Sequence, residues 1–363
     1  MKTLSLLIKP ASSLCNMRCD YCFYADVSEH RSVKSYGVMS PETVSALLSR
    51  VKETKAEEIT FAFQGGEPTV AGLPFFEDFA KKVKETLSGT LVHYALQTNG
   101  LLLDDAFVAF LKRENVLVGL SLDGYREIHD FLRHDCDKRG TFQRVMAAYD
   151  RLIKAGVDTN ILTVVTGPLS KCATKLWRFY QKNKMDFVQL IPCLEALDED
   201  CHQKWTLTPR QYAAFLKELF PLWAESLEKG DYTSIRLFDN LIRQSAGRAC
   251  EMCGMNGSCS PQFVVEADGS VYPCDFYVLD ELCCGNIRDN SFDEILEHPN
   301  MKRFLTPLLP KTCADCRFGG FCHGGCKRYR SLYLKEEGYC PYADFLTTAS
   351  RDIAKARYFV FGI

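Results

Sequence analysis

Short apolar runs alternate with amphipathic segments over roughly the first half of this chain. Six runs of strand length predict β-strands at Leu4–Lys9, Glu58–Phe63, Leu91–Gln97, Val116–Leu122, Val157–Val165 and Phe187–Ile191. Between them, apolar residues recur at helical spacing in Pro41–Lys55, Pro74–Leu87, Asp104–Arg113, Thr141–Ala155 and Lys171–Asn183. Repeated strand–helix pairs are typical of a parallel α/β sheet, open or partly closed as a barrel.

The pattern changes near Thr208. A long helix is predicted over Thr208–Lys229, followed by a C-terminal third rich in cysteine and glycine. Phe263–Val265 and Ser270–Tyr272 flank Asp268-Gly269, which predicts a β-hairpin. No flexible linker separates the parts. We therefore expect two packed domains, residues 1–207 and 208–363, the second beginning with the long helix.

Composition narrows the class of protein. Of 363 residues, 47% are hydrophobic and 25% charged, as in globular proteins, and the net charge of -2 argues against a nucleic-acid partner. We see no run of 18 apolar residues, so no membrane partner is expected. Eighteen cysteines without a predicted export signal favour a reducing cytoplasm and metal ligation over disulfides.

The most informative motif is Cys15-x3-Cys19-x2-Cys22. Three thiolates do not complete a structural zinc site, which takes four protein ligands. They can hold three corners of a cubane iron–sulfur cluster and leave its fourth iron open. A chance cluster or part of a zinc site is the alternative.

This motif resembles that of the radical S-adenosylmethionine (SAM) enzymes, in which a [4Fe–4S] cluster binds SAM through the open iron. The resemblance implies a partial (β/α)6 barrel. Gln64-Gly65-Gly66-Glu67-Pro68 follows the second predicted strand. Gly65 and Gly66 would allow close backbone approach to a ligand, and Glu67 could accept a hydrogen bond from an ammonium group. The resemblance implies that this motif contacts the SAM amino group; an ordinary turn is the alternative.

Polar residues at two further strand ends, Gln97 and Ser121, fit a ligand-binding rim. By resemblance, Ser121 and Arg133 would contact the SAM ribose or carboxylate, Leu194 would touch the adenine, and Tyr24 would lie beside the cluster loop. Each residue also has an ordinary explanation, such as a turn, an ion pair or the core.

Eight further cysteines lie in the C-terminal third, enough for two four-cysteine clusters, with a small zinc module as the alternative. Their order resembles the SPASM extension of peptide-modifying radical SAM enzymes. Carried over, cluster I would be held by Cys253, Cys259, Cys274 and Cys326, and cluster II by Cys313, Cys316, Cys322 and Cys340. Three [4Fe–4S] clusters are thus expected. The remaining cysteines, at positions 136, 172, 193, 201, 250, 283 and 284, are taken as structural.

Tyr272-Pro273-Cys274-Asp275-Phe276-Tyr277 and the segments around Lys9 and Gln64 resemble the anaerobic sulfatase-maturating enzymes over essentially the whole chain. The resemblance makes Asp275 the general base; a hairpin-capping carboxylate is the alternative. It implies that a 5′-deoxyadenosyl radical abstracts hydrogen from a peptidyl cysteine or serine of a sulfatase, giving Cα-formylglycine. A flavodoxin- or ferredoxin-type protein would donate electrons.

Two other functions stay open at this point. One is a SPASM-type enzyme that forms thioether or carbon–carbon crosslinks in a ribosomal peptide, since its clusters would be the same. The other is a non-catalytic zinc-binding interaction protein, against which the Gly-Gly-Glu-Pro motif argues.

Overall fold

The computed structural model describes residues 2–198 and 203–362, which fall into two compact units. The first unit comprises Met1–Ser121, Arg133–Thr159 and Pro261–Leu305, and the second comprises Leu122–Leu132, Asn160–Ser260 and Thr306–Ile363. Each unit is therefore built from three separate stretches of chain. The domain division after residue 207 stays a prediction, and Cys201 lies outside the described residues.

The first unit contains a sheet with strand order β9-β8-β1-β2-β3-β4. The strands are β1 (Thr3–Ile8), β2 (Glu58–Phe63), β3 (Leu91–Thr98), β4 (Val116–Ser121), β8 (Val264–Val265) and β9 (Val271–Tyr272). Strands β1 to β4 pair in parallel, which confirms the predicted parallel sheet. The predicted hairpin is also present: β8 pairs antiparallel with β9, and in parallel with β1 through Leu7↔Val264 and Ile8↔Val265.

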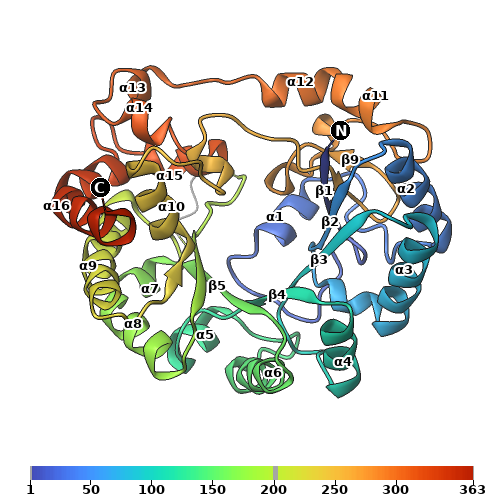
Figure 1. The fold of residues 1–363 in the computed structure, drawn as a ribbon, viewed down its shortest axis with the longest axis horizontal. Helices are drawn as coiled ribbons and strands as arrows, with labels where there is room; N and C mark the ends of the chain where they lie inside the picture. The colour runs from blue at the N-terminus through green and yellow to red at the C-terminus, as the bar shows by residue number, and fades with distance from the viewer. Residues whose placement is uncertain (1, 199–202, 363) are drawn as a thin grey trace. The chain divides into compact units, whose positions relative to one another are not determined.

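Helices of the first unit cover this sheet. They are α1 (Phe23–Glu29), α2 (Pro41–Glu53), α3 (Leu73–Thr86), α4 (Asp105–Arg113), α6 (Phe142–Ala155), α11 (Phe292–Glu297) and α12 (Pro299–Leu305). Helix α2 begins where predicted, because the Ser40 hydroxyl accepts a hydrogen bond from the Thr43 N–H at 3.2 Å. Helices α2 and α3 lie on one side of β2 and β3, and α1 lies on the other (Figure 1). The short α1 was not predicted.

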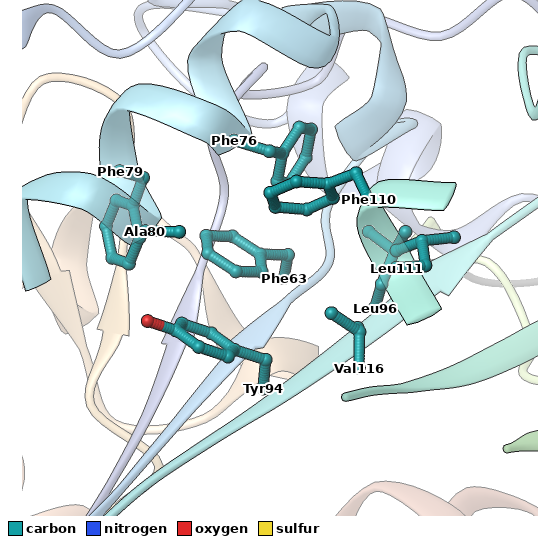
Figure 2. A pocket seen from close by; sticks show the side chains of 9 residues that line it. All are labelled: Phe63, Phe76, Phe79, Ala80, Tyr94, Leu96, Phe110, Leu111 and Val116. Carbon is teal, nitrogen blue, oxygen red and sulfur yellow. The ribbon is translucent and has the colours of Figure 1, made fainter. Parts of the chain in front are cut away.

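The core on the α3 and α4 side of the sheet is aromatic. Figure 2 shows Phe63, Phe76, Phe79 and Phe110 pointing toward one another, with Tyr94 beside them. The rings of Phe63 and Phe76 pack edge to face, with a centroid distance of 5.1 Å and an interplanar angle of 79°. Only about 10 Å³ of space remains among these side chains. Because its lining carries no charged group, we interpret it as core packing and not as a ligand site.

The second unit contains three parallel strands in the order β5-β6-β7. They are β5 (Thr159–Val165), β6 (Phe187–Pro192) and β7 (Ser234–Ile235). Its helices are α5 (Arg126–Leu132), α7 (Gly167–Ser170), α8 (Ala173–Lys182), α9 (Pro209–Glu228), α10 (Arg236–Ser245), α13 (Lys311–Ala314), α14 (Gly319–Cys322), α15 (Arg330–Tyr333) and α16 (Pro341–Phe361).

Two long helices of the second unit pack together. Helix α9 begins at a capping box formed by Thr208 and Gln211, and its Phe220 ring meets Phe345 of α16 at 5.5 Å. Helix α16 was not predicted, although buried Phe345, Ala349 and Ile353 recur at helical spacing. Within residues 2–198 and 203–362, no helix combines the length and apolar character needed to cross a membrane.

Candidate active site and cluster sites

The loop carrying Cys15, Cys19 and Cys22 joins β1 to α1, and all three side chains are partly exposed. The Cys15 Sγ accepts a hydrogen bond from the Met17 N–H at 3.3 Å. Burial raises the pKa of the Cys15 thiol to about 11, and the charges of Glu67 and Cys22 add to this rise. A thiolate here therefore needs positive charge beside it, which the iron of a cluster supplies. The residues present fit the implied cluster.

No three His, Cys, Asp or Glu side chains in the described part of the chain are arranged to hold a single metal ion. A cubane differs from a single ion because its cysteines bind separate irons.

The two glycines of the Gly-Gly-Glu-Pro motif lie against the cysteine loop. The N–H of Gly66 donates to the Ser12 carbonyl at 2.9 Å, and a Cβ on Gly66 would stand 2.2 Å from the Leu14 carbonyl oxygen. Gly65 has a φ of +111°, and its Cβ would stand 3.0 Å from Lys9 Cε. The close approach seen here is thus to the chain itself. The predicted contact of these glycines with SAM stays a prediction.

Glu67 joins the ends of β2 and β3. Its buried carboxylate accepts hydrogen bonds from the Thr69 N–H (3.1 Å), the Thr69 hydroxyl (2.6 Å), the Thr98 hydroxyl (2.6 Å) and the Asn99 N–H (2.7 Å). Burial raises the pKa of Glu67, and these hydrogen bonds oppose the rise. Four bonds from the chain identify a structural role for Glu67. A direct contact with the SAM amino group stays a prediction.

Three other residues that the sequence predicts near SAM are hydrogen-bonded within the first unit. The Gln97 amide donates to the Ser121 hydroxyl at 3.1 Å, across the ends of β3 and β4. Arg133 donates to the Tyr21 hydroxyl of the cysteine loop at 2.8 Å, and its charge lowers the pKa of Cys15. Leu194 is half-buried after β6 in the second unit. Their contacts with SAM stay predictions.

Asp275 lies in the first unit, just after the β8–β9 hairpin, and is 7% exposed. Its Oδ2 accepts a hydrogen bond from the Tyr24 hydroxyl at 2.5 Å. Its Oδ1 is buried and has no hydrogen-bond partner among the described residues. Burial raises the pKa of Asp275, while the Lys9 charge and the Tyr24 bond oppose the rise. One carboxylate oxygen is therefore held in place and the other is left to accept a proton.

Tyr24 also lies 3.0 Å from the Gln64 side-chain oxygen position. A hydroxyl carries one hydrogen, so Tyr24 cannot donate to both neighbours. Donation to the charged carboxylate is the stronger bond, and turning the Gln64 amide allows its NH₂ to donate to the Tyr24 oxygen. The chain Gln64–Tyr24–Asp275 then has consistent donors and acceptors. Tyr24, predicted beside the cluster loop, is a partner of the carboxylate.

A group of buried charged residues acts on Asp275. Glu266 pairs with Arg31 at 2.7 Å and with Lys9 at 3.7 Å, and the Lys9 ammonium lies 5.1 Å from the Tyr24 ring centroid. These cations lower the pKa of Glu266 against the rise caused by burial. No role was predicted from the sequence for Lys9, Arg31 or Glu266, and Gln64 was expected to act only as part of the glycine motif. The available signal was a charged residue at the end of an apolar strand, as at Lys9 and Glu266.

The second unit gathers seven of the eight C-terminal cysteines. Cys253, Cys259 and Cys326 line a hollow that is partly open to solvent, together with Lys327 and Arg330. Burial raises the pKa of Cys259, and the two cations oppose this rise. The fourth predicted ligand of cluster I, Cys274, belongs to the first unit.

The predicted ligands of cluster II also influence one another. Burial raises the pKa of Cys322, and the charges of Cys340, Cys313 and Cys316 add to the rise. Like charges act this way only when the groups are close, so these four cysteines lie near one another. The donor set fits a four-cysteine cluster, although the ligand assignment itself stays a prediction.

Comparison with known proteins decides the family. Residues 10–170 match the radical SAM superfamily, and residues 257–317 match the SPASM iron–sulfur cluster-binding domain. The chain is 42% identical to a cysteine-type anaerobic sulfatase-maturating enzyme of Clostridium novyi, over 90% of this chain and 89% of that protein. A Clostridium perfringens relative of the same description is 43% identical over 91% and 90%. The chain belongs to the anaerobic sulfatase-maturating enzymes.

Solved structures agree with this result. The structure of anSMEcpe with bound AdoMet and the Kp18Cys peptide has a TM-score of 0.90 and 40% identity, covering 98% of this chain and 99% of that one. Streptococcus suis SuiB with its precursor peptide SuiA has a TM-score of 0.62 at 16% identity, covering 94% of this chain and 74% of that one, and shares the fold alone.

These findings confirm several predictions. The chain is a radical SAM enzyme with the predicted α/β fold and a SPASM extension, and iron–sulfur clusters and SAM are its cofactors. The non-catalytic zinc protein is thereby excluded.

Proposed function

We propose that this enzyme oxidises a peptidyl cysteine of a sulfatase to Cα-formylglycine. Its identity is 42–43% to cysteine-type relatives and 27% to a serine-type relative of Bacteroides thetaiotaomicron, which favours cysteine over serine. The observation that carries the proposal is the Asp275 carboxylate, with one oxygen bonded to Tyr24 and the other buried without a partner. That arrangement suits proton removal from a thiol.

When bound, the reduced cluster and SAM supply a 5′-deoxyadenosyl radical that takes one hydrogen atom from the cysteine Cβ. Asp275 Oδ1 accepts the thiol proton, while Tyr24 holds Oδ2 and so fixes the direction of the free oxygen. Loss of one hydrogen atom to the radical, one proton to Asp275 and one electron, which the auxiliary clusters held by the C-terminal cysteines would accept, converts CH₂–SH to a thioaldehyde. Water then replaces sulfur, which leaves as hydrogen sulfide, and gives the aldehyde.

The chain's own residues would hold the cofactors near this carboxylate. Cys15, Cys19 and Cys22 would bind the cluster, and Gln97, Ser121 and Arg133 would line the SAM site. Gly66 and Glu67 fasten the cysteine loop to the sheet through the Ser12 and Leu14 carbonyls. The reacting atoms need to approach within roughly 3–3.5 Å, which explains the value of a loop fixed on a rigid sheet.

We further propose a flavodoxin- or ferredoxin-type electron donor and a cytoplasmic location. The support for the location is chemical: the seventeen described cysteines form no disulfide with one another, and a reducing compartment keeps thiols available as cluster ligands.

The test is anaerobic reconstitution with iron and sulfide, followed by reaction with SAM and a Cys-x-Pro-x-Arg peptide. Formylglycine formation from cysteine lowers the peptide mass by about 18 Da. The thioaldehyde that precedes the aldehyde is itself about 2 Da lighter than the peptide, so a loss of about 2 Da refutes the proposed product only if it persists in water and the product gives no carbonyl derivative, as for an internal crosslink. A matched serine peptide measures the preference between the two residues.

A further inference from the structure

The loop that follows β6 is held by the cysteine-rich C-terminal segment of the same unit. A guanidinium N–H of Arg328 donates a hydrogen bond to the Glu195 carbonyl oxygen at 2.8 Å. The Lys335 ammonium pairs with the carboxylate of the same residue. Arg328 lies 133 positions after Glu195 in the chain, and Lys335 lies 140 positions after it. Two long-range contacts within the second unit thus meet at one residue of the loop.

The position of this loop makes the contact relevant to ligand binding. Strands β5, β6 and β7 are parallel, so their carboxyl ends lie along one edge of the sheet, the edge at which α/β proteins bind ligands. The Cys193 N–H donates to the Val165 carbonyl at 3.0 Å, which fixes the beginning of the loop on the end of β5. Leu194, which is predicted to touch the adenine of SAM, therefore stands between two anchored residues, Cys193 and Glu195.

Arg328 projects from a turn that begins at Cys326, a predicted ligand of cluster I. The Tyr329 N–H closes this turn by donating to the Cys326 carbonyl at 3.1 Å, and the Arg330 side chain donates to the Gly324 carbonyl at 3.1 Å. The backbone that carries Arg328 is therefore fixed on both sides of the residue. A charged donor forms a stronger hydrogen bond than a neutral one, so the guanidinium is suited to holding a carbonyl of a distant loop.

We propose that Arg328 positions the loop after β6, and with it Leu194, for binding the adenine of SAM, and so links SAM binding to the segment that carries Cys326. The inference rests on the proposed function in taking Leu194, as predicted from the sequence, for a residue of the SAM site. Arg328 is a positioning residue, because its bond is to the Glu195 carbonyl. Such a link is reciprocal: if the turn at Arg328 favours bound SAM, bound SAM stabilises that turn by the same factor.

The experiment compares Arg328→Gln with wild type and Lys335→Gln in the full chain after anaerobic reconstitution. Equilibrium dialysis of the unreduced protein gives the dissociation constant of SAM and, separately, that of methionine. We expect Arg328→Gln to raise the SAM constant about tenfold and the methionine constant less than about twofold, because methionine has no adenine. Lys335→Gln removes a half-exposed ion pair to the same residue and should leave both constants within about twofold of wild type.

An unchanged SAM constant in Arg328→Gln overturns the inference, and so does an equal loss of affinity for methionine, which would mean a general disturbance of the site. If that variant takes up no iron, amide hydrogen exchange of the wild-type protein decides. SAM should then slow exchange in residues 326–330 as well as in residues 193–198, and protection confined to 193–198 refutes the link. Neither measurement uses a peptide, so a failure of the proposed formylglycine reaction would be recognised separately.

Discussion

The cysteine loop of the first unit and the cysteine-rich segment of the second are stabilised in different ways. Residues 12–16 are fastened to the ends of β2 and β3 by hydrogen bonds, from the Gly66 and Glu67 N–H groups at 2.9 and 2.7 Å and from the Asn99 amide to Asn16 at 2.7 Å. Residues 306–340 contain α13, α14 and α15, each of four residues, joined by turns. Isolated helices of that length are unstable in water.

We infer that the cysteine loop of the first unit is formed before its cluster binds, whereas residues 306–340 need their cluster in order to fold. In the first unit, the sheet fixes the loop before any cluster binds. In the second, the cysteines lie on short helices and turns, so we expect cluster binding to contribute directly to folding, as it does in small metal-binding domains. The comparison predicts that losing a cluster abolishes chemistry in the first unit and structure in the second.

Replacing Cys15, Cys19 and Cys22 together by Ala should have the largest effect on chemistry. We expect deoxyadenosine formation from SAM to fall below detection, because the open iron site is lost, while the fold and the iron of the C-terminal sites persist. Chromatography of the nucleoside and iron analysis measure both. Persistent deoxyadenosine production would contradict the assignment. Replacing Cys313, Cys316, Cys322 and Cys340 by Ala is the matched variant, and it should instead open residues 306–340 to proteolysis.

Replacing one glycine by alanine in each region should also affect the two regions differently. Gly66→Ala places a Cβ 2.2 Å from the Leu14 carbonyl oxygen, whereas Gly320→Ala in α14 meets no atom within 4 Å. Backbone cannot yield as a flexible side chain does, so we expect Gly66→Ala to cost about 1–3 kcal/mol and to displace the cysteine loop.

For both glycine variants, the iron content of the first site and the free energy of unfolding in denaturant are measured. Gly320→Ala should match wild type in both. Normal iron loading and stability of Gly66→Ala would show that the loop is not fixed by this contact.

The sequence predicts the fold better than it predicts the neighbours of Asp275. Strand β2 is found at the predicted residues, and β1, β3 and β4 differ from the prediction by one residue at one or both ends, since alternation of apolar residues is local information. The meeting of Tyr24 with Asp275 requires β8 to pair with β1, strands more than 250 residues apart. No local pattern encodes that pairing. Asp275 itself was selected by resemblance, and Lys9 behind it was not selected at all.

Asp275→Asn should uncouple SAM cleavage from product formation. The amide is nearly isosteric and can still accept from Tyr24, but its remaining group cannot take a proton. We expect deoxyadenosine formation to be largely retained while formylglycine falls by roughly 10²–10⁴-fold. Mass spectrometry of the peptide and chromatography of the nucleoside give the ratio. The control is Asp280→Asn, an exposed carboxylate in the same region that accepts from the Ser32 N–H. Equal product yields in the two variants would remove Asp275 from the base role.

Lys9→Met should have the smallest effect of the four, and it tests whether the fixed first site also depends on buried charge. Met keeps the unbranched stem that lies against Gly65 but removes the ammonium, so Glu266 keeps only Arg31 and Asp275 loses the cation that lowers its pKa. We expect formylglycine per deoxyadenosine to fall about tenfold, equivalent to about 1.4 kcal/mol, with iron content unchanged.

The control for Lys9 is Lys34→Met, which removes an exposed lysine paired with Glu29 and should leave the ratio at the wild-type value. A Lys9→Met enzyme with a normal ratio would mean that the Tyr24 bond alone holds the carboxylate. A variant that loses iron would mean that Lys9 supports the loop through packing against Gly65. Only a lowered ratio at full iron loading assigns the effect to charge, because packing loss would reduce SAM cleavage and product together.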